Sequence, residues 1–452
     1  MALTPDQWLA RLTKAMDDRG PRLAMLRSYM DGNAPLPEGA EGCRDAYKDF
    51  QKKARTNFGE LVSAAVTERL IPSGASVGGK AEDDDTLRAV WKRNRLQIGI
   101  ADVLDDMIGL SVGYLIVSEG PDRKAIVTCE RPEQVITEQS ASRPDQVRAG
   151  IKVYRDEIDG FDVAKLHLPG VVHTYYRELR DGSGLFKPPM RVQGDWAYAG
   201  NEETGLRFVP IFPFLNRGGM GEFEPHVDVL DRINWNILQR LVITAMQAYR
   251  QRATKGDLPS EDEAGNEIDY ADMFKPGPGA LWQLPEGVEL WESQQTDISS
   301  ILAANKDDIT HLAAVTRTPM STLIPDGANQ SAEGASFAKE GLVFKAGDRR
   351  SRAAASLDLA LGAALAIELG LDMPVEDVES KWLPVERQSL QERADAATKA
   401  QDLPWRTRMT DIWQFSEDRV DSMESERASD ALNAALSQPS AAPVTRGDQP
   451  EA

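Results

Sequence analysis

Residues 227–252 read VDVLDRINWNILQRLVITAMQAYRQR, and this stretch contains neither proline nor glycine. Its apolar side chains recur every three or four residues, which places them on one face of a helix. The members of this stripe are Val227, Leu230, Ile233, Ile237, Leu241, Ala245 and Ala248. The stretch therefore predicts a helix of about 25 residues, roughly 38 Å long at 1.5 Å per residue.

A second helix with the same spacing is predicted at residues 297–317, and a compact module separates the two. Residues 257–272 of this module hold seven acids and no base. Alternating apolar residues at 279–284 and 288–291 flank Pro285-Glu-Gly287, which predicts a β-hairpin. After the second helix, Pro319, Pro325 and Gly327 indicate a loop over 318–330. A helix rich in alanine and glycine is predicted next, at 331–369.

The chain before residue 227 divides into a helical start and a β-rich part. Helices are expected before and after a turn-rich loop at 31–37, and the second of them, at 45–70, ends at Pro72 and Gly74. Two more helices are expected after Asp83 and at 98–111. Residues 112–216 read as β-rich, with strands at 112–117, 125–129, 147–155 and 171–179. The two prolines in 209–215 restrict that segment to a sheet edge or an extended crossover.

The C-terminal part is predicted to be helical at 389–399 and 405–436, and the polar, proline-rich tail 437–452 is predicted to be disordered. The whole chain is thus expected to be α+β and mainly helical.

Composition restricts the function classes. The net charge is −20, so the chain lacks the global basic character of a conventional nucleic-acid binder. Its two cysteines, Cys43 and Cys129, lie far apart, which argues against a disulfide framework. The four histidines show no metal-ligand spacing with them, so neither a metal nor a cofactor is expected. The apolar run 353–371 is interrupted by Asp358 and Glu368, which favours a buried helix over a membrane span. No signal peptide is expected at the N-terminus.

The stretch LIPSGASVGGKA at 70–81 resembles two catalytic motifs without completing either. A phosphate-binding loop needs a hydroxyl residue after its lysine, where this chain has Ala81, and it follows a strand. The acids at 82–85 would also repel a triphosphate. A serine-nucleophile elbow needs a strand before Ser76 and a helix directly after it. We expect a flexible loop here and assign no catalytic residue.

Two further charged features each have a structural explanation as well as a functional one. The acid pairs Asp105-Asp106 and Asp307-Asp308 are expected on solvated helix faces, although metal-dependent nuclease chemistry is their alternative. The basic cluster of the long C-terminal helix either pairs with acids such as Glu340 and Asp348 or contacts a polyanion or another subunit. Its members are Lys345, Arg349, Arg350 and Arg352.

Several short motifs follow one another over residues 25–435. They are Ser28-Tyr-Met-Asp-Gly32, Asn57 to Val62 with Glu68-Arg-Leu70 and Gly74, Trp91-Lys-Arg-Asn94, Gly109 to Val117, Val209 to Asn216, Ala314 to Pro319 with Ser331-Ala-Glu333, and Lys381-Trp-Leu-Pro384 with Ala394 to Ala397 and Lys399. Each motif is weak alone, but their order resembles that of the portal proteins of tailed double-stranded-DNA bacteriophages, of the siphophage type.

The resemblance implies a portal architecture by segment. A wing would span 1–222, stem helices 223–252 and 297–317, a clip 253–296, a channel loop 318–330, a connecting helix 331–375 and a crown 376–436. The loop residues expected to face DNA are Thr318, Met320, Ser321, Thr322, Asp326, Asn329 and Gln330. The clip acids expected to dock partners are Glu261, Asp262, Glu263, Glu267, Asp269 and Asp272, although solubility alone also explains them.

The function that the resemblance implies is structural. Such proteins form rings, usually of twelve subunits, at one vertex of the virion, and the ring is assembled in the host cytoplasm. DNA passes through the ring non-specifically during packaging and ejection. The expected partners are the terminase large subunit, which hydrolyses the ATP, a head–tail adaptor, and the major capsid and scaffolding proteins, with no membrane. An acidic conduit suits moving DNA, because each strong phosphate contact would hold it back. The alternatives are a metal- or nucleotide-dependent nucleic-acid-processing enzyme and a capsid structural protein without a channel.

Overall fold

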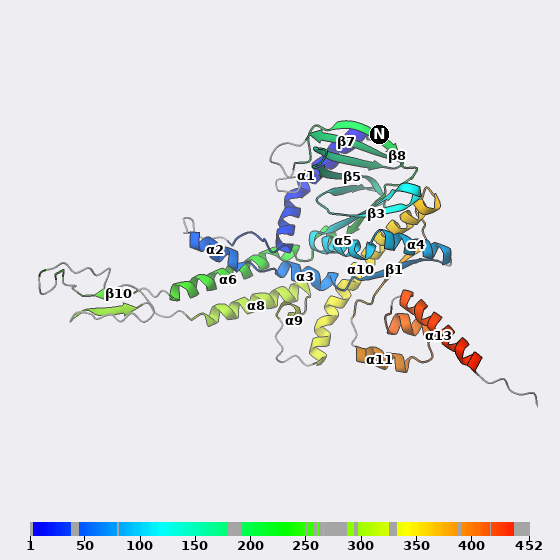
Figure 1. Cartoon of the computed structure of the whole chain (residues 1–452). Helices are drawn as coiled ribbons and strands as arrows, with labels where there is room; N and C mark the ends of the chain where they lie inside the picture. The colour runs from blue at the N-terminus through cyan, green and yellow to red at the C-terminus, as the bar shows by residue number, and fades with distance from the viewer. Residues whose placement is uncertain are drawn as a thin grey trace, which may run out of the picture. The chain divides into compact units, whose positions relative to one another are not determined.

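The computed structural model describes residues 3–37, 45–78, 81–178, 191–248, 252–256, 260–261, 265, 287–292, 297–324, 332–386, 390–415 and 417–437. The chain forms two compact units (Figure 1). Unit 1 comprises residues 1–19, 66–219 and 343–452, and unit 2 comprises 20–65 and 220–342. The long helices α1 (Pro5–Met30) and α10 (Ala332–Leu369) each contribute residues to both units. The fold is α+β, with more helix than strand, as the sequence predicted.

The centre of unit 1 is a five-stranded antiparallel sheet. Its order is β4-β5-β6-β7-β8, formed by Val135–Gln139, Val147–Asp156, Phe161–Leu168, Val171–Glu178 and Ala197–Glu203. One face of the sheet packs against the first turns of α1, where Trp8, Leu9, Leu12 and Met16 are buried. This core explains why strands with alternating apolar residues form here: their inward side chains face an apolar helix stripe. The sequence reading identified β5 and β7 but did not recognise β4, β6 and β8.

A three-stranded sheet, β3-β2-β9, lies in the same unit. Its middle strand β2 (Val112–Glu119) pairs with β3 (Ala125–Glu130) and with β9 (Ile211–Leu215). Strand β9 contains Pro213 and lies at the edge, as the missing proline N–H requires. Helices α4 (Ala81–Arg93) and α5 (Leu96–Leu110) precede the sheet. Gly113 allows β2 to approach α5, because a Cβ there would lie 2.3 Å from the Val103 carbonyl oxygen.

The third sheet of unit 1 corrects an expectation. Residues 72–77 form strand β1 (Pro72–Val77), where a flexible loop was expected. Its antiparallel partner is β12 (Val378–Trp382), about three hundred residues later in the chain. A strand whose only partner lies so far away in sequence leaves no local signal, since period and turn residues report on neighbours.

The C-terminal helices of unit 1 are α11 (Leu390–Lys399), the short α12 (Trp405–Thr407), a π-helical turn η4 (Arg408–Ile412) and α13 (Glu417–Ser437). The continuous helix expected at 405–436 is therefore interrupted. Gln414 adopts a left-handed backbone with φ of 58°, which an α-helix cannot contain. The tail at 438–452 lies outside the described residues.

Unit 2 is built around two helices that lie side by side, α6 (Val227–Ala248) and α8 (Ser299–Thr316) (Figure 1). Helix α6 ends earlier than expected, because residues 252–255 form strand β10 (Arg252–Lys255). The helix expected at 45–70 is two helices, α2 (Asp45–Ala54) and α3 (Phe58–Thr67). The break between them places Thr56 where its backbone N–H and hydroxyl both donate to Asn234 of α6.

Among the described residues, no helix combines the length and the apolar character that a bilayer crossing needs. The apolar part of α10 is instead a buried helix of unit 1, with Leu357, Leu361, Ala364 and Leu365 nearly inaccessible. Cys129 is a free thiol, and burial raises its pKa to about 12.

Candidate stem, channel-loop and docking segments

The contact between α6 and α8 combines apolar packing with one charged anchor. Leu230, Ile233 and Leu238 of α6 and Ile309 and Leu312 of α8 are buried. Asp308 of α8 accepts a hydrogen bond from Asn236 Nδ2 at 2.6 Å and pairs with Arg232 Nε at 2.8 Å. Asp308 is only 9% exposed, so the expectation of a solvated acid pair at 307–308 is wrong for this member. A carboxylate buried between helices is stabilised only by such partners.

The N-terminal half of α6 and the 3₁₀ turn η3 (Glu224–His226) that precedes it are also held by residues 20–65. Tyr29 donates to Asp231, and Arg22 contacts Glu224 through Nε and Nη2, each at 2.6 Å. Burial and the hydrogen bond to Asp231 raise the pKa of the Tyr29 hydroxyl. The bidentate geometry of Arg22 fixes direction as well as distance. Helix α6 is therefore tied by polar contacts both to α8 and to the helices that precede it in the chain.

The predicted channel loop begins with a buried turn. Thr318 was expected to face DNA, but it is buried at 3% exposure. Its hydroxyl accepts a hydrogen bond from the Thr316 hydroxyl at 3.0 Å. The next residues form the short helix α9 (Met320–Leu323) where irregular loop was expected. Ser321 and Thr322 are exposed, and Met320 is half-buried. Asp326, Asn329 and Gln330 lie outside the described residues.

The predicted clip is described in two short strands and a few flanking residues. Strand β10 pairs in antiparallel register with β11 (Glu289–Glu292). The hairpin predicted from 279–284 cannot be compared, because that segment lies outside the described residues. Of the predicted docking acids, Glu261 is described, and it is exposed. The other predicted acids, Asp262, Glu263, Glu267, Asp269 and Asp272, also lie outside the described residues.

The basic cluster of α10 is partly structural. Arg349 and Arg352 both contact Asp348, the latter at 3.2 Å, which is the acid pairing that the sequence suggested. Burial alone would raise the pKa of Asp348, but the hydrogen bonds from Arg349 and Arg352 outweigh it and lower the pKa. Lys345 and Arg349 are 7% and 9% exposed, so a polyanion does not reach them in this fold. Arg350 is half-buried and Arg352 exposed.

The segment 70–81 contains a strand and a following helix, contrary to the expectation, yet it does not build either catalytic motif. The Val77 N–H donates to the Asp84 carboxylate at 2.6 Å, and the Gly78 N–H donates to the Asp377 carbonyl at 3.1 Å. Two amides that a phosphate would need are thus occupied, one of them by a carboxylate. Ser76 lies within β1 and lacks the positive φ of a strained nucleophile turn.

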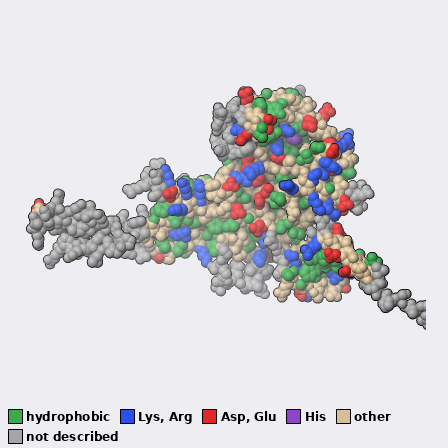
Figure 2. All heavy atoms as spheres, viewed as in Figure 1, with side chains coloured by type: hydrophobic (Ala, Val, Ile, Leu, Met, Phe, Trp, Pro, Cys, Tyr) green, Lys and Arg blue, Asp and Glu red, His purple; other side chains and the backbone are tan. Residues whose placement is uncertain are grey.

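Among the residues that the structure describes, no cluster of three potential metal-binding side chains occurs. The acid pair Asp105-Asp106 was expected on a solvated face, but Asp106 is buried at 7% exposure. Figure 2 shows acidic and basic side chains interspersed over the described part of the visible face, rather than a continuous basic field.

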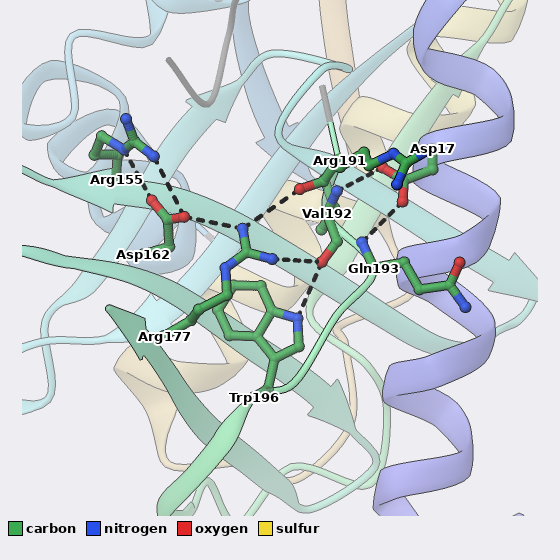
Figure 3. Close-up of polar contacts among 8 residues, drawn as sticks. All are labelled: Asp17, Arg155, Asp162, Arg177, Arg191, Val192, Gln193 and Trp196. Atoms are coloured by element: carbon green, nitrogen blue, oxygen red, sulfur yellow. Dashed lines mark hydrogen bonds and ion pairs between the residues drawn. The ribbon is translucent and has the colours of Figure 1, made fainter. Parts of the chain in front are cut away.

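One buried ion-pair network was not found from the sequence. Asp162 of β6 contacts Arg155 of β5 and Arg177 of β7, both at 2.9 Å, and is 2% exposed (Figure 3). Arg177 also donates to the Val192 carbonyl at 3.1 Å and stacks on Trp196, with 4.4 Å between its guanidinium carbon and the ring centroid. The available signal was an arginine or aspartate one residue from the end of each of the three strands, of which β6 was not predicted.

The same network anchors the backbone that follows. Asp17 of α1 accepts from the N–H groups of Val192 and Gln193, at 2.5 and 2.8 Å (Figure 3). Trp196 Nε1 donates to the Val192 carbonyl at 3.0 Å. Residues 191–196 are thus fixed onto unit 1 by side chains of α1 and β7. The network stiffens one end of the five-stranded sheet.

Comparison with known proteins gives three findings. The family model described as "Phage portal protein, SPP1 Gp6-like" matches residues 9–431. The portal protein of Mycobacterium phage L5 is 24% identical over 415 residues, which cover 86% of this chain and 80% of the relative. Two solved structures are similar, "Virion of native gene transfer agent (GTA) particle" and "Neck of native GTA particle computed with C12 symmetry". Their identities are 12% and 13% and their TM-scores 0.41 and 0.42; the matches cover 86% and 87% of this chain and 97% and 98% of theirs.

Proposed function

Because this chain belongs to the phage portal protein family, we propose that twelve copies of it enclose a channel for double-stranded DNA. The chain is a structural subunit of a homo-oligomeric portal ring, which lies at a capsid vertex of the virion. The DNA enters through it during packaging and leaves through it during ejection. The observation that carries this proposal is the family match over residues 9–431. The α6–α8 pair supports it, since two long helices joined through a small module suit a channel wall with a protruding clip.

The proposal extends to the partners of the ring. The clip, residues 253–296, docks the terminase large subunit during packaging and a head–tail adaptor afterwards, through its acids. The exposed Glu261 is the described member of that set. The ring assembles in the host cytoplasm with the major capsid and scaffolding proteins. The subunit itself has a structural role, and the ATP of packaging is hydrolysed by the terminase.

The set of residues that we propose to face DNA is smaller than the set that the sequence suggested. Ser321 and Thr322 are accessible at the surface of α9, whereas Thr318 is buried. Asp326, Asn329 and Gln330 remain part of the proposed channel loop. From the basic cluster, Arg350 and Arg352 are kept as candidates for contact with DNA or with a neighbouring subunit, since they are more accessible than Lys345 and Arg349.

Electron microscopy of the purified full-length chain tests the proposal. We expect closed rings with a central hole in axial views and a mass of twelve times the 49.7 kDa of one chain. A second measurement addresses the enzyme alternative, using ATP hydrolysis by the wild-type chain and by Lys80→Ala. Axial views without a hole, or hydrolysis that the substitution abolishes, would contradict the proposal.

A further inference from the structure

The face of the five-stranded sheet opposite the α1 core carries an ordered set of side chains. Cross-strand partners share a face, and successive residues alternate between faces. On β5, β6 and β7, the register aligns Asp156 with Phe161 and Glu178, Tyr154 with Val163 and Tyr176, and Lys152 with Lys165 and Thr174. This end of the face therefore has an acidic row, an aromatic row and a lysine row, in that order.

The aromatic part of this face is accessible in the structure. Phe161 and Tyr176 are 37% and 40% exposed, and their ring centroids lie 5.8 Å apart at an interplanar angle of 54°. Val163 is buried beneath them, and Tyr154 is half-buried. Ile158, in the turn between β5 and β6, is 97% exposed. Apolar surface that remains open on an ordered sheet is a typical feature of an interaction site.

The turn and the sheet end are ordered before any partner arrives. The Asp156 carboxylate accepts hydrogen bonds from the N–H groups of Ile158 and Asp159, both at 3.0 Å. On the other face of the same three strands, the Arg155–Asp162–Arg177 network fixes their alignment. A partner that docks here would therefore bind a preorganised surface, which lowers the entropic cost of association.

The charges around the aromatic row select the partner. Glu157, Asp159 and Glu178 are exposed and Asp156 is half-buried, and the described residues provide no ion pair to any of the four. In the lysine row, by contrast, Lys152 is bound to Glu130 at 2.6 Å. The four carboxylates outnumber Lys165, which has no ion pair among the described residues, so the net charge on the described part of this face is negative. Phosphates of nucleic acid would be repelled, whereas lysine and arginine would be attracted both by the carboxylates and by the aromatic ring faces.

We propose that this face, formed by Tyr154, Asp156, Ile158, Phe161, Tyr176 and Glu178, docks a cationic and partly aliphatic segment of another protein. Lysine or arginine side chains of the segment pair with Asp156 and Glu178 and stack on Phe161 and Tyr176. Its aliphatic side chains cover the aromatic row and Ile158. The inference concerns unit 1 alone, and it stands whether or not the proposed channel does.

Synthetic peptides supply the test. A fluorescein-labelled peptide of alternating arginine and leucine pairs is titrated with the full-length chain, and its anisotropy is followed. A second peptide with glutamate in place of arginine is the counterpart. We expect the arginine peptide to bind, and Phe161→Ser with Tyr176→Ser to weaken it about tenfold. Glu178→Lys should weaken binding to a similar degree and reduce its dependence on salt.

Matched controls lie in the same sheet. Tyr198→Ser removes an aromatic side chain of β8 that is 55% exposed, and Glu203→Lys makes the same charge change on β8. Both variants should bind the arginine peptide as the wild type does, and circular dichroism verifies that each variant is folded. Equal binding of the glutamate peptide would overturn the proposal. It is also overturned if the controls weaken binding as much as the test variants, or if the Phe161 and Tyr176 changes alter only the oligomeric state.

Discussion

Asp308 illustrates how a single side chain can determine the relation between two long helices. Asp308 of α8 accepts a hydrogen bond from Asn236 and forms an ion pair with Arg232, and both partners belong to α6. Its neighbour Asp307 is exposed, with a side chain 69% accessible. Sequence alone presents the two acids as equivalent, because adjacent helical residues differ only in which face they occupy.

Replacing Asp308 with alanine should therefore destabilise the α6–α8 pair. The loss of a charge-assisted hydrogen bond and an ion pair at a nearly buried position is expected to cost about 1–3 kcal/mol in the free energy of unfolding. Urea denaturation monitored by tryptophan fluorescence measures the difference. Asp307→Ala is the matched control and should change stability by less than about 0.5 kcal/mol. Equal effects of the two substitutions would show that Asp308 does not anchor the helices.

Glu368 gives a prediction that depends on pH. Its carboxylate accepts from the Ala125 N–H at 2.8 Å and pairs with Arg93 and Lys124. Burial alone would raise the pKa of Glu368, but these partners lower it below the ordinary value of 4.5. A carboxyl group whose pKa is lower in the folded state stabilises the fold above its unfolded pKa, and the contribution disappears as the pH falls through the folded pKa.

The variant Glu368→Gln should therefore be less stable than the wild type at pH 7. The difference should shrink as the pH is lowered through the region below 4.5. Urea midpoints measured from pH 7 down to pH 3 follow this convergence, with Glu376→Gln on an exposed loop as the control. A gap between the two proteins that stays constant across the series would contradict the assigned role of the charge.

At the scale of elements, the sequence predicted the helices and strands that have a regular hydrophobic spacing of their own. Helices α5, α6, α8 and α10 and strands β2, β3 and β5 lie close to where spacing placed them. Strand β1 was missed because its hydrogen bonds are made to β12. The break between helices at 55–57 was missed because the Thr56 N–H there donates to Asn234 of α6, which is distant in sequence. Of the candidate site, Thr318 was expected to face DNA, and Lys345 was one possible contact to DNA or to another subunit. Both are buried, which residue type and spacing did not indicate.

The pairing of β10 with β11 supports a disulfide prediction. Lys255 and Glu289 are cross-strand partners, whereas Leu290 points to the opposite face of the ribbon. In a background without the native cysteines, Lys255→Cys with Glu289→Cys should form a disulfide on mild oxidation, because directly opposed Cβ atoms lie within its reach. Peptide mapping by mass spectrometry detects the crosslink. The control pair, Lys255→Cys with Leu290→Cys, should remain reduced, and crosslinking of only that pair would contradict the register.

At the scale of the whole molecule, the net charge of −20 and the exposed hydroxyls of Ser321 and Thr322 predict a channel that does not hold DNA tightly. Counterion release makes the slope of log affinity against log salt grow with each phosphate contact. Adding lysines at the loop, as Ser321→Lys with Thr322→Lys, should therefore strengthen binding of linear DNA to the assembled protein. The salt slope should steepen at the same time.

The control for this prediction adds the same charge elsewhere. Leu390→Lys with Leu432→Lys changes two exposed leucines of α11 and α13, at 72% and 61% exposure, and leaves α9 unchanged. If the loop lines the path of the DNA, only the loop variant should change the salt slope measured from 50 to 200 mM salt. Equal slopes for the two variants would place α9 away from the DNA. The same result would leave the family assignment intact, because that rests on the match over residues 9–431 and not on the loop.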